Sequence, residues 1–218
     1  MTKIYLTILS LFFTCFAFGQ QIEVCASCEI SSIKQAISIA QAYDTIIVKK
    51  GVYNEHDIQI GKPLALIGID KPTVDGQEKG PIFEIEADSV TLSGFIINNV
   101  ERSHTKDYAA VHIFKSDHIL LEKNEFNNPF FAYLIEKSHN GIIRDNVING
   151  NAVVEHSSGN GIHLWHCSNM EILNNQVYQM RDGIYFEFVK SSKVANNISK
   201  HNIRYGLHFM FSNNDEYI

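Results

Sequence analysis

The chain has 218 residues, of which 45% are hydrophobic and 19% are charged, and its formal net charge is −6. This composition is typical of a globular protein and excludes a largely disordered one. The negative balance gives no electrostatic basis for binding DNA or RNA, so we expect no nucleic-acid partner.

The N-terminal segment predicts export from the cytoplasm. Lys3 supplies a positive charge, and residues 4–18 are apolar. Residues 17–19 (AFG) have the small-x-small pattern of a signal-peptide cleavage site, so the mature chain would begin near Gln20. The apolar stretch is short for a membrane span, and an uncleaved anchor helix is the alternative. We therefore expect a signal peptide at 1–19, a mature domain at 20–218 and a periplasmic protein.

An oxidising compartment changes how the cysteines are interpreted. Cys25 and Cys28 form a CxxC pair, which favours a local disulfide. Two thiolates at this spacing would also suit Cu(I) or zinc, so a soft-metal site is the alternative. Cys167 is then left without a cysteine partner.

The segment after the CxxC pair predicts a short helix and then a strand. Ser31 or Ser32 can cap the helix, and apolar residues recur at the positions of one buried helical face: Ile33, Ala36, Ile37 and Ala40. Residues 45–48 (TIIV) are β-branched and favour a strand. A helix at this point would cover the exposed end of a solenoid.

Short apolar segments then recur at a near-constant step. Runs at 64–67 and 90–92 predict two less regular coils. The clean coils then begin 22, 29, 22 and 23 residues apart, at Ala110, Ala132, Gly161, Gly183 and Gly206. Fourteen residues after each of the first four lies an asparagine: Asn124, Asn146, Asn175 and Asn197. A fixed period of this length indicates a solenoid of stacked coils.

Each clean coil contains two apolar runs of only a few residues, with no helix-length amphipathic stretch between them. This excludes βαβ units and helical repeats. We predict an all-β fold, a right-handed parallel β-helix with coils of about 22 residues and a short N-terminal capping helix. We expect the asparagines to stack at a left-handed turn, and the polar residues 151–158 to loop out.

Alternation along a strand assigns each side chain to the inside or the outside. The first and third residues after each coil's opening Gly or Ala are apolar and predicted to face the core. The second and fourth then form two outward columns: His112, Leu134, His163, Tyr185 and His208, and Phe114, Glu136, Trp165, Glu187 and Met210. Adjacent coils lie about 4.8 Å apart, so neighbours within a column would be close.

This outward face is unusual because it is rich in imidazole and aromatic groups. The simplest interpretation is an adhesive sheet face that another part of the protein or a partner covers. The sharper one is copper handling, since imidazole, thioether and thiolate groups suit that metal. The candidate ligands are then His208 and Met210, followed by His163, with weaker candidates in His166, Cys167, Cys25 and Cys28.

The acidic residues of the same face support another interpretation. Glu136 and Glu187 flank Trp165 in one column, about 9.6 Å apart along two coils. Two carboxylates at such a separation could serve inverting glycoside hydrolysis. The alternative function is therefore a β-helical carbohydrate-active enzyme: a polysaccharide lyase, an epimerase or a hydrolase.

Three segments also resemble a known family. The runs at 159–165 (GNGIHLW), 181–185 (RDGIY) and 204–213 (RYGLHFMFSN) are similar, in order and spacing, to the signature series of the NosD family. Members of that family are periplasmic β-helical maturation proteins for nitrous oxide reductase. The resemblance covers nearly all of the mature chain and is strongest from about residue 107 to 217.

The resemblance implies a role in copper supply rather than catalysis. It predicts transient binding of copper as Cu(I), for assembly of the copper–sulfide site of nitrous oxide reductase. The implied partners are the ATPase and membrane subunits of an ABC-type system, a membrane-anchored copper chaperone and the reductase. On this basis we expect no enzyme, and no catalytic or cofactor-binding residues. Family members continue past residue 218, so we expect the chain to be truncated at its C-terminus.

Overall fold

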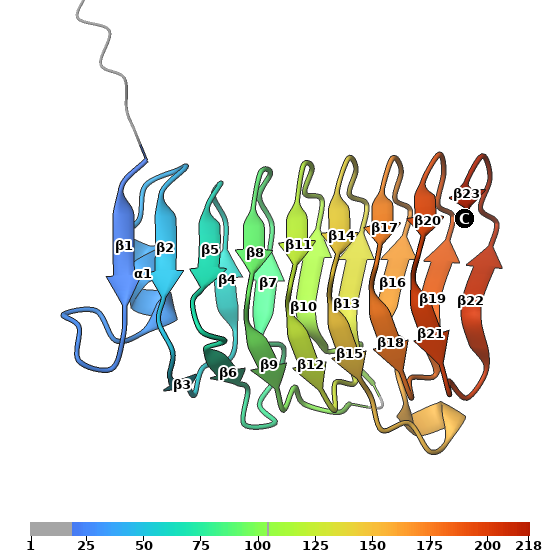
Figure 1. Cartoon of the computed structure of the whole chain (residues 1–218), viewed down its shortest axis with the longest axis horizontal. Coiled ribbons are helices and arrows are strands. Elements are labelled where there is room, and N and C mark those ends of the chain that lie inside the picture. Colours follow the sequence, from blue (N-terminus) through green and yellow to red (C-terminus); the bar gives the residue numbers. More distant parts are fainter. Residues whose placement is uncertain (1–18, 104) are drawn as a thin grey trace, which may run out of the picture.

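The structure, a computed structural model, describes residues 19–103 and 105–218. Its strands stack as successive coils along one long axis, from the N-terminal to the C-terminal end (Figure 1). Paired strands run parallel throughout, which confirms the predicted parallel β-helix. The predicted signal peptide, apart from Gly19, lies outside the described residues.

Three parallel sheets form the walls of the solenoid. Sheet 1 consists of β1 (Gln21–Val24), β2 (Thr45–Val48), β5 (Ala65–Gly68), β8 (Thr91–Ser93), β11 (Leu120–Glu122), β14 (Ile142–Arg144), β17 (Glu171–Leu173), β20 (Lys193–Ala195) and β23 (Glu216–Tyr217). Sheet 2 consists of β4 (Ile58–Ile60), β7 (Phe83–Ile85), β10 (Ala109–Phe114), β13 (Phe131–Glu136), β16 (Ile162–Trp165), β19 (Asp182–Glu187) and β22 (Tyr205–Met210). Sheet 3 consists of β3 (Val52–Tyr53), β6 (Thr73–Asp75), β9 (Ile96–Asn98), β12 (Glu125–Asn127), β15 (Val147–Asn149), β18 (Gln176–Tyr178) and β21 (Ile198–Lys200). The sequence predicted two runs per coil and missed the third strand, which supplies sheet 3.

The N-terminal end is closed by a helix and by a strand that the sequence did not predict. Helix α1 (Ile33–Ile39) is capped by Ser32, whose side chain accepts a hydrogen bond from the Gln35 amide, and its predicted apolar face is buried. Strand β1 precedes the helix and pairs with β2, so the CxxC segment lies between β1 and α1. The cap is therefore a strand and a helix together (Figure 1).

The predicted asparagine ladder is present; Asn124, Asn146 and Asn175 are buried, whereas Asn197 is partly exposed. Each of the first three bonds to the asparagine of the next coil; for example, Asn146 Nδ2 donates to Asn175 Oδ1 at 2.9 Å and Asn175 Nδ2 to Asn197 Oδ1 at 3.0 Å. The core residue Tyr133 joins the ladder by donating its hydroxyl proton to Asn146 Oδ1 at 3.0 Å. One detail was wrong: the left-handed backbone belongs to the residue before each ladder asparagine, namely Lys123, Asp145, Asn174 and Asn196.

The inward side chains of sheet 2 fill the bore, as predicted. Residues such as Val111, Ile135 and Phe186 have no exposed surface, whereas Leu207 on the last described coil is 41% exposed. The insertion at 151–158 loops out between β15 and β16 and carries a short 3-10 helix, Glu155–Ser157 (Figure 1). No helix among the described residues has the length and apolar character needed to cross a membrane.

Candidate functional site

The outward face of sheet 2 carries the two predicted columns in the predicted register. His112 pairs with Leu134, Leu134 with His163, His163 with Tyr185, and Tyr185 with His208. The second column runs through Phe114, Glu136, Trp165, Glu187 and Met210 on the same strands. The first column also extends backwards to Glu84 on β7, which pairs with His112.

A groove of ≈ 470 Å³ lies over these columns. Its floor comes from the outward side chains of sheet 2, and one wall comes from Lys106, Asp107 and Tyr108 in the segment between β9 and β10. The lining residues are Pro81, Glu84, Lys106, Asp107, Tyr108, Ala109, His112, Leu134, Glu136, His163, Trp165 and Glu187. Sequence analysis missed Glu84 and Asp107, because neither belongs to a clean repeat. Glu84 is placed by the pairing of β7 with β10, and Asp107 lies in the connection between β9 and β10.

Two carboxylates of the groove lie on either side of its tryptophan. Glu136, Trp165 and Glu187 are consecutive members of one column, so the backbones of the two acids are about 9.6 Å apart. Glu136 is held by His112, whose Nε2 lies 2.7 Å from Glu136 Oε2. Glu187 Oε2 lies 3.8 Å from His163 Nε2, which is longer than a hydrogen bond. The two acids therefore have different surroundings.

His163 faces outward but is mostly covered by aromatic neighbours. Its ring lies between Phe131 and Tyr185, with centroid separations of 6.0 and 4.6 Å, and only 14% of its side chain is exposed. Its Nε2 atom is buried without a hydrogen-bond partner. Burial, helped by the nearby positive charge of Arg181, lowers the pKa of His163 to about 4. His163 is thus neutral at physiological pH.

His208 and Met210 occupy the far end of the columns, outside the groove lining. His208 Nδ1 lies 3.3 Å from Asp182 Oδ2, and the Tyr185 hydroxyl donates to Met210 Sδ at 3.0 Å. Asp182 also accepts hydrogen bonds from Arg204, so this Arg–Asp pair braces the corner. Burial would raise the pKa of Asp182, but the bonds from Arg204 and His208 outweigh burial and lower it.

The weaker ligand candidates do not form one cluster: Cys25 and Cys28 lie together between β1 and α1, apart from His166 and Cys167, which follow β16. The prediction for Cys167 is wrong, because its side chain points into the core, where its thiol donates to the Ile135 carbonyl at 3.4 Å. Burial raises the pKa of Cys167 to about 12, so a thiolate is not available there. His166 is exposed and stacks on Phe188 with the ring planes 5° apart, which places it in an aromatic column at the sheet margin.

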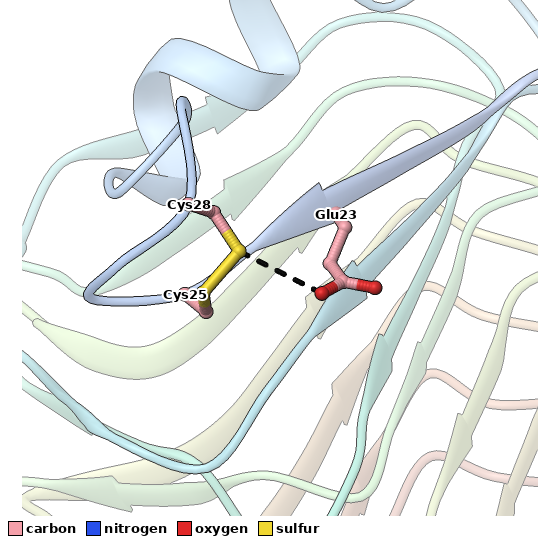
Figure 2. A group of neighbouring side chains, drawn as sticks. All are labelled: Glu23, Cys25 and Cys28. Carbon is pink, nitrogen blue, oxygen red and sulfur yellow. Dashed lines mark hydrogen bonds between the residues drawn. A yellow bond between two sulfur atoms is a disulfide. The ribbon is translucent and has the colours of Figure 1, made fainter.

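Cys25 and Cys28 are joined by a disulfide, as the CxxC spacing favoured. Figure 2 shows this bond with the Glu23 carboxylate beside it, one oxygen lying 3.6 Å from Cys28 Sγ. A disulfide sulfur is not a thiolate, so the alternative of a soft-metal site, where ligand atoms of Glu23, Cys25 and Cys28 lie within 4.8 Å of one another, requires reduction of this bond.

Residues 81–216 match the family described as "Right handed beta helix region". The chain belongs to this right-handed β-helix family. The match extends over sheet 2 from β7 onward and therefore includes both outward columns. A search of curated proteins finds no match.

Several solved structures share the fold. Pectin methylesterase PemA from Erwinia chrysanthemi is 14% identical with a TM-score of 0.55, and the alignment covers 84% of this chain and 66% of that one. A rhamnogalacturonan lyase is 12% identical, with a TM-score of 0.54 and coverage of 81% and 68%. A candidate glycosyl hydrolase from Parabacteroides merdae is 12% identical, with a TM-score of 0.56 and coverage of 91% and 96%. The chain thus spans 66% of the pectin methylesterase, but nearly all of the last protein.

These structures contradict the expectation that the chain is not an enzyme, because the proteins that share its fold are carbohydrate-active enzymes or are assigned as such. The comparisons likewise give no support to NosD in particular, to copper or to an ABC-type system. At 12–14% identity the likeness establishes the fold alone. The reaction has to be argued from the groove.

Proposed function

We propose that this β-helix is a carbohydrate-active enzyme that hydrolyses a glycosidic bond in the groove of sheet 2. The observation that carries the proposal is the order of one column, in which Glu136 and Glu187 lie on either side of Trp165 in an open groove. Trp165 offers an apolar ring on which a sugar can pack. The two acids then face the same bound sugar from neighbouring positions.

The spacing favours inversion over retention. Inverting hydrolases place their carboxyl groups about 6.5–9.5 Å apart, whereas retaining ones need about 5–5.5 Å. The backbones of Glu136 and Glu187 are about 9.6 Å apart, and flexible side chains can shorten the distance between carboxyl groups. That leaves room for one water molecule beside the sugar.

The surroundings of the two acids suggest their roles. We assign Glu136 as the base that takes a proton from water, because the bond with His112 at 2.7 Å fixes its orientation. Glu187 becomes the acid that protonates the leaving oxygen. Its neighbour His163 is neutral at physiological pH, since burial lowers its pKa to about 4, so it places no positive charge beside Glu187. Water loses its proton to Glu136, and the glycosidic oxygen gains one from Glu187.

The test is release of reducing ends from a panel of oligosaccharides, followed by NMR of the first anomer formed. We expect activity with inversion, and a loss of at least about 100-fold in kcat for Glu136→Gln and for Glu187→Gln. The matched control is Glu171→Gln, on the exposed face of β17 in sheet 1, which should leave kcat unchanged. Activity that survives both groove substitutions would contradict the assignment.

Copper binding is a second proposal, favoured by one observation at the far end of the columns. His208 and Met210 both project outward from β22, two residues apart, and so offer an imidazole and a thioether on one side. On this proposal copper is cargo, the protein is exported to the periplasm, and its partners are those implied by the NosD resemblance. Titration with Cu(I) should show stoichiometric binding that a His208→Ala, Met210→Ala double variant weakens. Binding unaffected by that variant would exclude the pair as ligands.

A further inference from the structure

We propose that the groove selects against acidic glycans and prefers sugars that carry amino groups. This inference deepens the proposed glycosidase function and rests on it. Its basis is the charge of the lining: the acidic side chains of Glu84, Asp107, Glu136 and Glu187 face a single ammonium, that of Lys106. Even with Glu187 protonated, as its proposed role as the acid requires, three carboxylates outnumber that one ammonium.

The four acids are spread along the whole groove. Glu84 and Glu136 lie on β7 and β13, with the His112 strand between them, while Glu187 lies two strands further on. Asp107 approaches from the wall formed by the segment before β10. A bound sugar chain would therefore meet an acidic side chain at every second strand, and a carboxylate on the sugar would be repelled where that side chain is ionised.

The nearby cations do not cancel this charge. Lys106 is engaged by Tyr108, with its Nζ 3.1 Å from the Tyr108 hydroxyl and 5.4 Å from the ring centroid. Lys115 and Lys137 follow the second column but lie outside the lining, with their ammonium groups over aromatic rings. Lys137 Nζ, for example, lies 5.0 Å from the centroid of the Trp165 ring. No arginine belongs to the groove lining.

This conclusion separates the protein from the solved structures that share its fold. Those structures include pectin methylesterases and a rhamnogalacturonan lyase. Fold likeness would suggest a similar acidic substrate, whereas the charges of this groove oppose one. The charge pattern is a property of this chain's own side chains, so it takes precedence in choosing a substrate class.

The experiment uses two pairs of oligosaccharides that differ only in charge. One pair is an oligogalacturonate and its methyl ester; the other is a glucosamine oligomer and its N-acetylated form, all measured near pH 6.5 by calorimetry. We expect the ester to bind at least tenfold more tightly than the free acid, and the free amine severalfold more tightly than the acetylated form. Both ratios should shrink when salt rises from about 50 mM to about 500 mM.

Charge-removing variants provide the control. Glu84→Gln and Asp107→Asn should each reduce both ratios, whereas Glu171→Gln on sheet 1 should change neither. If the free galacturonate binds as tightly as its ester, or more tightly, the selectivity is refuted while the proposed function stands. If no member of either pair binds, the proposed function fails, and this inference fails with it.

Discussion

The buried, neutral state of His163 predicts that the fold loses stability on mild acidification. In the unfolded chain this imidazole titrates near 6.5, whereas in the fold burial lowers its pKa to about 4. Between these values the unfolded state binds more protons than the folded state. The contribution of His163 to the free energy of unfolding is therefore fully present above pH 6.5. It is lost progressively as the pH falls towards 4.

The size of the effect follows from linkage. The pKa difference corresponds to about 3 kcal/mol in total, of which about 2 kcal/mol should disappear between pH 7 and pH 5. The positive charges of Arg181 and His208 also lower the pKa of His163, whereas the negative charge of Asp182 raises it. Asp182 and Glu122 themselves have lowered pKa values, so their contributions are lost only in more acid solution.

The assay is urea unfolding at several pH values, with His163→Phe as the comparison. Phenylalanine keeps a ring between Phe131 and Tyr185 but removes the titrating group. We expect the unfolding free energy of the original chain to fall by about 2 kcal/mol from pH 7 to pH 5, and that of the variant to fall much less. Equal pH dependence in the two proteins would refute the burial argument.

Three further predictions concern the ladder, the core thiol and the groove. Asn175→Ala should lower the free energy of unfolding in urea by about 2–4 kcal/mol, because it leaves the Asn146 amide unpaired in the core. The control, Asn169→Ala at an exposed asparagine, should lower it by less than about 1 kcal/mol. Cys167 should react with a maleimide only after unfolding, because its thiol is buried and its pKa is raised to about 12. Fast labelling of the folded protein would contradict its inward placement. Trp165→Ala should weaken oligosaccharide binding at least tenfold by calorimetry, and unchanged affinity would place the sugar elsewhere.

Much of the fold could be predicted because its information is repeated. The asparagines recur fourteen residues into successive coils, and residues at one offset must stack when coils are in register. The same periodicity predicts that Glu136, Trp165 and Glu187 share one column, and the strand register confirms it. The strand that the sequence did not predict is the third of each coil, where no residue type recurs strongly enough to mark a strand. The third strand of each coil has one inward side chain, such as Phe126 or Ile148, which is too short a pattern to recognise.

The site was less predictable because half of it is not repetitive. The wall containing Asp107 belongs to a connection that has no counterpart in other coils. The degree to which His163 is covered depends on the rings of Phe131 and Tyr185, which come from two other coils. Alternation assigns a side chain to the outside of a sheet, but it does not state how much of that side chain its neighbours bury.

The two functional proposals make separate demands on one face of the molecule. Glycoside hydrolysis needs the carboxylates of Glu136 and Glu187, within the groove, whereas copper binding needs the imidazole of His208 and the thioether of Met210, beyond it. The two ends meet at β19 and β22, where Glu187 is adjacent to Met210 and Tyr185 contacts both His163 and His208. Glu136 is three strands from β22 and touches neither proposed ligand in the register. Glu136→Gln should therefore abolish hydrolysis without changing Cu(I) affinity, and His208→Ala should do the reverse. If either substitution impairs both properties, the columns work as one site and the division into groove and far end is wrong.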